Sequence, residues 1–143
     1  MKTLKQLLAG KRRPLAVVAP GDSVFHALSL MAQHDVGALM VLDGEQLVGI
    51  FSERDYARKI ILHGKNSKDT LVSEIMSDKV AYVTLGVTLD ECMALMTEKH
   101  FRHLPVLSED GTVAGIISIG DLVKETISSQ QFLIKQLEHY ISG

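Results

Sequence analysis

The sequence predicts an α+β fold in which one β-α-β-β-α unit occurs twice, with the two copies packed through their sheets and a helix added at the C-terminus. The segment that starts at Ala16 aligns with the segment that starts at Ala81 at an offset of 65 residues, which becomes 66 after one added turn residue. Identical residues at matched positions are Gly21/Gly86, Met31/Met96, Val41/Val106, Gly49/Gly115, Ser52/Ser118 and Asp55/Asp121. Two copies at so long a period are too few for a solenoid. One small unit, duplicated and packed against itself, therefore explains the pattern and predicts two related sites.

The length and composition indicate one globular domain whose two halves share a core. The chain has 143 residues, of which 46% are hydrophobic and 22% are charged, enough to bury one core but not two independent ones. We divide it into residues 1–70 (an N-terminal segment and the first repeat), 71–128 (the second repeat) and 129–143 (a C-terminal helix). Since helices can cover only one face of such a small sheet, the two uncovered faces are expected to pack together.

Each repeat is expected to begin with a strand and a helix. Residues 15–19 and 80–84 are rich in β-forming side chains, and a turn with glycine follows each of them. Apolar residues then recur at helical spacing. The first of these helices is expected to start at Asp22 or Ser23, and the second at Thr88, which has a glutamate three residues later as in a capping box.

Two strands and a second helix are expected to complete each repeat. The predicted strands are residues 38–42 and 47–51 in the first copy and residues 104–107 and 113–117 in the second. Glycine and acidic residues between the members of each pair are typical of hairpin turns. The last strand of each copy leads into a helix that starts at Ser52 or at Ser118. Residues 63–78 form a linker between the copies, whose polar part leads into Leu71, Val72, Ile75 and Met76.

The end of the chain is predicted to form an extra helix. Phe132, Leu133, Leu137 and Ile141 lie at near-helical spacing within residues 130–141. Such a helix is expected to pack on the module or on a second subunit.

Charge, hydropathy and cysteine content exclude several classes of function. A net charge of −2 gives no overall attraction to nucleic acid or to an anionic membrane, and no apolar run is long enough to span a bilayer. The local basic run of Lys11, Arg12 and Arg13 is interpreted as a solvated patch. The amino terminus lacks the pattern of a secretory signal, so a cytoplasmic location is expected. The single cysteine, Cys92, excludes an internal disulfide and a cysteine-based zinc site.

The strand-to-helix corner is the most informative constellation. Each copy places a serine at the end of a strand and an aspartate three residues later, as Ser52 with Asp55 and Ser118 with Asp121. Free backbone N–H groups at a helix start attract phosphate, and a carboxylate can accept two hydrogen bonds from a vicinal diol. Together these groups suit a ribose phosphate. The alternative is that the same residues only cap helices, although their recurrence at matched positions weakens that interpretation.

These motifs resemble the CBS (cystathionine-beta-synthase) domain in its tandem form, the Bateman module. The resemblance rests on V-x-x-I-M at residues 72–76, on the helix spacing L-x-x-x-x-x-x-M, on L-P-V at residues 104–106, and on G-I-[IF]-S-x-x-D at the end of each repeat. It covers roughly residues 15–127, and the chain further resembles the stand-alone CBS-pair proteins of bacteria and plant organelles, which carry no attached enzyme. The resemblance implies an adenine-nucleotide-binding regulatory protein that forms a homodimer.

The resemblance also implies one ligand site per repeat. We expect the first site to contain Val18, Ala19, Gly37, Ala38, Leu39, Ser52, Glu53, Arg54, Asp55 and Arg58. We expect the second site to contain Met76, Val83, Thr84, Arg102, His103, Leu104, Pro105, Ser118, Ile119, Gly120 and Asp121. In the family the aspartate holds ribose, the hydroxyl holds phosphate, and the basic pair before L-P-V reaches phosphates, a role that falls on Arg102 and His103 here. AMP is the expected ligand, with ADP, ATP or NAD as possibilities.

Nothing in the sequence predicts catalysis. No nucleophile has a paired base in sequence, the histidines lack metal-ligand spacing, and no phosphate-binding P-loop is present. Cys92 is expected to be a buried, inert thiol. Two alternatives stay open: a structural interaction module with non-functional clefts, and a regulator of a thioredoxin-like partner, as suggested by plant relatives.

Overall fold

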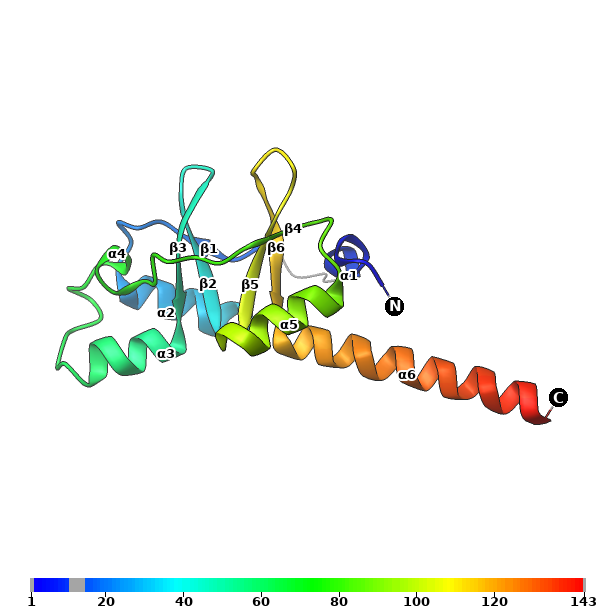
Figure 1. Ribbon diagram of the computed structural model, residues 1–143. Helices are drawn as coiled ribbons and strands as arrows, with labels where there is room; N and C mark the ends of the chain where they lie inside the picture. The colour runs from blue at the N-terminus through cyan, green and yellow to red at the C-terminus, as the bar shows by residue number, and fades with distance from the viewer. Residues whose placement is uncertain (1, 11–14, 143) are drawn as a thin grey trace.

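The computed structural model describes residues 2–10 and 15–142, and contains two three-stranded sheets with helices packed around them (Figure 1). The basic run predicted at residues 11–13 lies outside this range. The first repeat comprises β1 (Val17–Val18), α2 (Val24–His34), β2 (Ala38–Asp43), β3 (Gln46–Ser52), α3 (Glu53–Asp55) and a π-helical stretch η1 (Tyr56–Ile61). The second comprises β4 (Val83–Thr84), α5 (Leu89–Lys99), β5 (His103–Leu107), β6 (Val113–Ser118) and α6 (Ile119–Ser142). Two short helices precede the repeats, α1 (Leu4–Gly10) and α4 (Val72–Ile75).

The two sheets have the same topology, as the duplication predicts. In each, the short first strand pairs in parallel with the second, and the second pairs antiparallel with the third. Both antiparallel ladders also have an irregularity at the same place, between Val41 and Leu42 and between Val106 and Leu107. Because the two register shifts fall at matched positions, the strands of the two sheets pair in the same register. The predicted α+β class and the duplicated strand order are confirmed.

The predicted helix starts agree with the structure. Ser23 is the N-cap of α2, and its hydroxyl accepts a hydrogen bond from the N–H of His26 at 3.1 Å. Thr88 caps α5 in the same way through the N–H of Glu91. Both helices end in a left-handed residue, Asp35 (φ 53°) and His100 (φ 58°), again 65 positions apart.

Each short helix that precedes a repeat packs on the other repeat, an exchange that the sequence did not predict. Leu4 of α1 is fully buried in the core of the second repeat, whereas Val72 and Ile75 of α4 are buried in the core of the first. The two helices also cover equivalent glycines, since Leu8 lies over Gly115 of β6 and Met76 lies over Gly49 of β3. Each repeat therefore needs a segment that precedes the other one.

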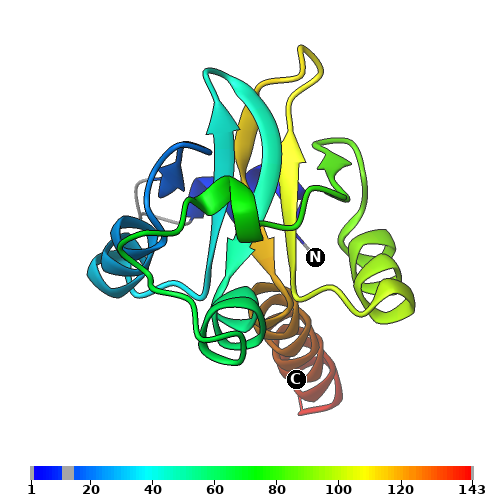
Figure 2. The ribbon, with the colours of Figure 1, turned by 90° about the vertical axis from the view of Figure 1, so that its left-hand side faces the viewer.

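The C-terminal helix is real, but it is the continuation of α6 rather than a separate element. The helix runs unbroken for 24 residues and extends away from the sheets (Figures 1 and 2). In the first repeat the chain leaves the helix before Gly64, which has φ 66°, a conformation that favours glycine after a helix. The matched position in the second repeat is Gln130, so no residue of this kind stops α6.

Candidate functional site

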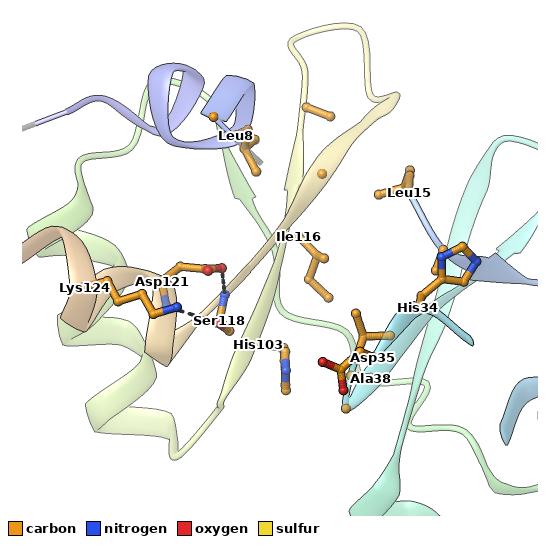
Figure 3. Close-up of a pocket in the computed structure, with 16 residues that line it drawn as sticks. Leu8, Leu15, His34, Asp35, Ala38, His103, Ile116, Ser118, Asp121 and Lys124 are labelled. Atoms are coloured by element: carbon orange, nitrogen blue, oxygen red, sulfur yellow. Dashed lines mark hydrogen bonds between the residues drawn. The ribbon is translucent and has the colours of Figure 1, made fainter. Parts of the chain in front are cut away.

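A cleft of about 860 Å³ lies between the two repeats. One wall comes from the first repeat: Leu15, Ala16 and the turn from His34 to Ala38. The other comes from β6, the start of β5 and the start of α6, and the end of α1 also lines it. Figure 3 shows these side chains around the opening. Because both repeats and α1 contribute, the cleft forms only when these parts pack together.

The corner of Ser118 and Asp121 forms one wall of this cleft. The Ser118 N–H donates to Asp121 Oδ2 at 2.8 Å, and the Asp121 N–H donates to Ser118 Oγ at 3.1 Å, as drawn in Figure 3. This reciprocal pair is a capping box, so the capping role considered for these residues is present. Both side chains are nevertheless half-buried and line the cleft. A carboxylate has room for further hydrogen bonds beyond a cap, so capping and ligand contact are compatible here.

The corner of Ser52 and Asp55 has the same capping box, and a lysine lies close to its carboxylate. The Ser52 N–H donates to Asp55 Oδ2 at 3.0 Å, and the Asp55 N–H donates to Ser52 Oγ at 3.2 Å. Lys59 lies 3.6 Å from Asp55 Oδ1 and donates to the carbonyl of Ile75 at 2.9 Å. The matched position in the second repeat holds Glu125 in place of Lys59. The two corners therefore share their backbone geometry and differ in the residue one turn further along the helix.

Two basic side chains of the second repeat line the cleft beside Asp121. His103 lies at the start of β5, and Lys124 lies one turn into α6 (Figure 3). The opposite wall carries His34 and Asp35 at the end of α2. The cleft thus has a carboxylate suited to hydroxyls in the same wall as a lysine and a histidine, which are side chains suited to an anion.

The cleft takes its members from both of the predicted sites. Gly37 and Ala38, expected beside Asp55, lie in the cleft with Ser118 and Asp121. Of the basic pair, only His103 is among the lining residues. Arg102 has an exposed side chain, and its carbonyl accepts a hydrogen bond from the N–H of Ile119 at 2.9 Å. The prediction grouped residues of the same repeat. In the structure, the start of β2 in the first repeat lines the same cleft as the Ser118 and Asp121 corner of the second repeat.

The other predicted residues lie in three kinds of environment. Buried in the sheets are Val18, Leu39, Val83, Leu104 and Pro105. Exposed at strand ends or in helices are Ala19, Arg54, Arg58, Thr84, Ile119 and Gly120. Glu53 lines a smaller pocket of about 340 Å³ beside α2, and Met76 packs over β3. None of these residues is among those that line the larger cleft.

Sequence reasoning missed several residues of the cleft, including Leu8, Leu15, His34, Asp35 and Lys124. For Lys124 the signal was available, because it is the counterpart of Arg58, which was selected. For Leu8 no signal was available, since its position depends on the exchange of α1 between the repeats. His34 and Asp35 precede the predicted strand and enter the cleft through the left-handed turn that ends α2.

Other chemistry finds little support among the described residues. No group of three or more histidine, cysteine or acidic side chains in residues 2–10 and 15–142 is placed to hold a metal ion. Within the same ranges no helix is long and apolar enough to cross a membrane. Cys92 is fully buried, and this burial raises the pKa of its thiol, with a smaller effect from the charge of Glu91. A neutral buried thiol is a poor nucleophile.

Comparison with known proteins identifies the repeats. Residues 6–62 and 72–128 each match the CBS domain family. The chain belongs to the CBS-domain family. Among curated relatives, it is 42% identical over 127 residues to the CBS domain-containing protein CBSX3, mitochondrial, of Arabidopsis thaliana, a match that covers 85% of this chain and 61% of that protein. The chain thus spans less than two thirds of that relative's length.

Solved structures agree with this assignment. A putative signal-transduction protein with CBS domains from Burkholderia ambifaria superposes with a TM-score of 0.84 at 50% identity, covering 90% of this chain and 96% of that one. The structure of CBSX2 in complex with AMP, a CBS-pair protein from Arabidopsis thaliana, superposes with a TM-score of 0.73 at 29% identity, covering 91% and 99%. The matched relatives are CBS-domain proteins, and the two repeats account for most of this chain.

Proposed function

We propose that this protein is a regulatory module that binds an adenine nucleotide, with AMP as the first candidate, in the cleft between its repeats. The observation that carries the proposal is the corner of Ser118 and Asp121, which opens into a cleft of about 860 Å³. Ligand pockets of small molecules commonly have volumes of roughly 300–1,000 Å³. The AMP complex of CBSX2, a CBS-pair protein of similar fold, supports the choice of ligand.

Each wall of the cleft has a role in this proposal. The carboxylate of Asp121 accepts hydrogen bonds from the ribose hydroxyls, and Ser118 with the start of α6 faces the phosphate. His103 and Lys124 supply positive charge to that phosphate. The first-repeat wall, with Ala16 and the backbone from Val36 to Ala38, lies opposite the ribose site and forms an apolar slot for the base. No tryptophan is available for stacking, so the slot depends on aliphatic side chains and backbone groups.

The internal duplication extends the proposal to a second, weaker site at Ser52 and Asp55. At the offset of 65 residues, Arg102 is the counterpart of Gly37, and His103 is the counterpart of Ala38. Arg102 is therefore expected to serve a phosphate at the Asp55 corner. Ser118 and Asp121 line the cleft of about 860 Å³, whereas Ser52 and Asp55 do not, which favours the Asp121 site.

Regulation follows if the ligand contacts two states of the protein differently. Since α1, both repeats and α6 all line the cleft, a bound nucleotide couples segments that are far apart in sequence. The protein would act without catalysis of its own, and its regulated partner would bind the liganded and unliganded states with different affinities. NAD, ADP and ATP are alternative ligands. The rival function, a structural module with empty clefts, requires the two corners to act as caps alone.

Isothermal titration calorimetry of the full chain with AMP, ADP, ATP, NAD and S-adenosylmethionine tests the proposal. We expect at least one ligand to bind more tightly than about 1 mM, or roughly 4 kcal/mol. Asp121→Ala should abolish the better site, and Asp55→Ala, which removes an equivalent cap, should leave it intact. No heat with any of the five ligands at millimolar concentration would favour the structural rival. Equal losses in both variants would assign the effect to helix capping rather than to ligand contact.

A further inference from the structure

The distal part of α6 carries an apolar face that its own chain does not cover. This distal face consists of Leu133, Ile134, Leu137, Tyr140 and Ile141, which are exposed by 58%, 53%, 52%, 86% and 82%. Every residue from position 130 to position 141 is exposed, and the segment extends away from the sheets in both ribbon views (Figures 1 and 2). A contiguous apolar face of this kind on a helix commonly marks an interaction site. The face therefore needs a partner.

The spacing within this segment is that of a helix that packs on another helix. Gln130, Ile134, Leu137 and Ile141 follow one another at steps of four, three and four residues, the a/d pattern of a heptad. On one side of this seam lie Leu133 and Tyr140, which widen the apolar face. On the other side lie Gln131 and Glu138, which are polar. The face is thus asymmetric, with one apolar flank and one polar flank.

We propose that the distal face packs antiparallel against the distal face of a second copy of this chain. In an antiparallel pair, flanks of the same kind meet, so Leu133 contacts Tyr140 of the second copy and Gln131 lies beside Glu138 of that copy. A parallel pair would instead place the apolar flank of one helix against the polar flank of the other. The central layers then join Ile134 to Leu137 of the second copy, with Ile141 over Gln130 at each end.

The size and charge of the face support a second copy as the occupant. Five large apolar side chains on each helix would bury roughly 1,000 Å² in total, near the lower limit for a specific interface. Residues 130–141 carry Lys135 and Glu138 as their only lysine, arginine or acidic side chains, so two copies do not repel one another. An interfacial membrane helix would need a polar face rich in lysine and arginine, which one lysine does not provide.

Analytical ultracentrifugation of the full chain tests the pairing. Ile134→Asp/Leu137→Asp places four charges in the centre of the paired helices, whereas Ser128→Asp/Gln136→Asp adds the same charge outside the seam. We expect the first variant to halve the mass at concentrations where the wild type and the control are fully associated. An unchanged mass would overturn the proposal. So would a monomeric wild type, or one that associates only with vesicles of phosphatidylcholine and phosphatidylglycerol.

Disulfide trapping tests the antiparallel register and does not depend on a folding-sensitive substitution. The double variant Leu133→Cys/Tyr140→Cys should form a covalent dimer under mild oxidation, because each new thiol faces the other one across the pair. Leu133→Cys alone should stay uncrosslinked, since its own copies lie about 10 Å apart along the axis, or seven residues at about 1.5 Å each. Rapid crosslinking of the single variant, or none in the double variant, would contradict the register. The pairing is independent of nucleotide, so both experiments can succeed if the proposed ligand is wrong.

Discussion

A methyl group added at Gly115 should weaken the attachment of α1 to the second repeat. A Cβ atom there would lie 2.8 Å from Leu8 Cδ2 and 3.3 Å from Leu8 Cδ1, so the leucine must move. Overpacking of a well-packed site costs about 1–3 kcal/mol. Because the obstructing atoms are the end of a flexible side chain, Gly115→Ala should cost about 1 kcal/mol of the free energy of unfolding.

The equivalent change at Gly49 should cost more. Its Cβ would lie 2.5 Å from Met76 Sδ and 3.0 Å from the backbone oxygen of Ser77. That oxygen belongs to a segment fixed by two hydrogen bonds to Ile50, of 3.0 Å and 2.9 Å. A backbone oxygen held by these hydrogen bonds cannot move away from the new methyl group as the end of a side chain can. We therefore expect Gly49→Ala to cost about 2–3 kcal/mol, at the upper end of the overpacking range.

Urea unfolding followed by circular dichroism measures both costs, and a double-mutant cycle with Leu8→Ala identifies their origin. In the Leu8→Ala background, Gly115→Ala should become nearly neutral, because the atoms that it displaces are gone. Gly49→Ala should keep its full cost in that background, since Leu8 is not its neighbour. An equal cost of Gly115→Ala in both backgrounds would refute the exchange of α1 onto the second repeat.

Two further predictions follow from the titrating groups. Burial raises the pKa of Cys92, with a smaller contribution from Glu91. The native thiol should therefore react with Ellman's reagent at pH 8 only as fast as the protein unfolds. Rapid labelling of the native state would contradict this prediction. At Asp110, a hydrogen bond from the Thr112 hydroxyl at 2.7 Å and one from the Thr112 N–H at 3.1 Å lower the carboxyl pKa. The stabilisation from these bonds is present above the unfolded pKa and is lost as the pH falls through the folded pKa. Thr112→Val should raise the pKa of Asp110 toward its ordinary value in an NMR titration, and an unchanged midpoint would show that the hydroxyl does not matter.

Local signals were sufficient to predict the elements of each repeat. Thr88, with Glu91 three positions later, indicated the start of α5, and Ser23 was one of two candidate starts for α2. The strands followed from alternating or continuous apolar runs. The duplication then supplied what single segments could not, because a pattern found twice at one offset is unlikely to be incidental. The structure places the boundaries of the strands within one or two residues of the prediction, except for the shorter β1 and β4.

Relations between the repeats were beyond the sequence. The exchange of α1 and α4 depends on which sheet edge each short helix reaches, and nothing in the residues around Leu8 or Met76 specifies the partner sheet. The composition of the cleft has the same cause, because Gly37 faces Asp121 only through the packing of one repeat on the other. The prediction separated the C-terminal helix from the helix before it, whereas α6 is continuous. The reason is that Gln130 stands where the first repeat has the glycine that follows its helix.

The discrimination between AMP and 2′-deoxy-AMP tests the central proposal most directly, since the two ligands differ only in a hydroxyl that Asp121 is proposed to hold. A hydrogen bond to a charged group is worth about 1.5–3 kcal/mol, so the wild-type protein should prefer AMP by roughly 10-fold to 150-fold in calorimetric titrations. Asp121→Ala should bind the two ligands equally, whereas Asp55→Ala should keep the preference. A wild-type protein that binds both ligands alike, or an Asp121→Ala variant that still prefers AMP, would contradict the assignment of the ribose to this corner.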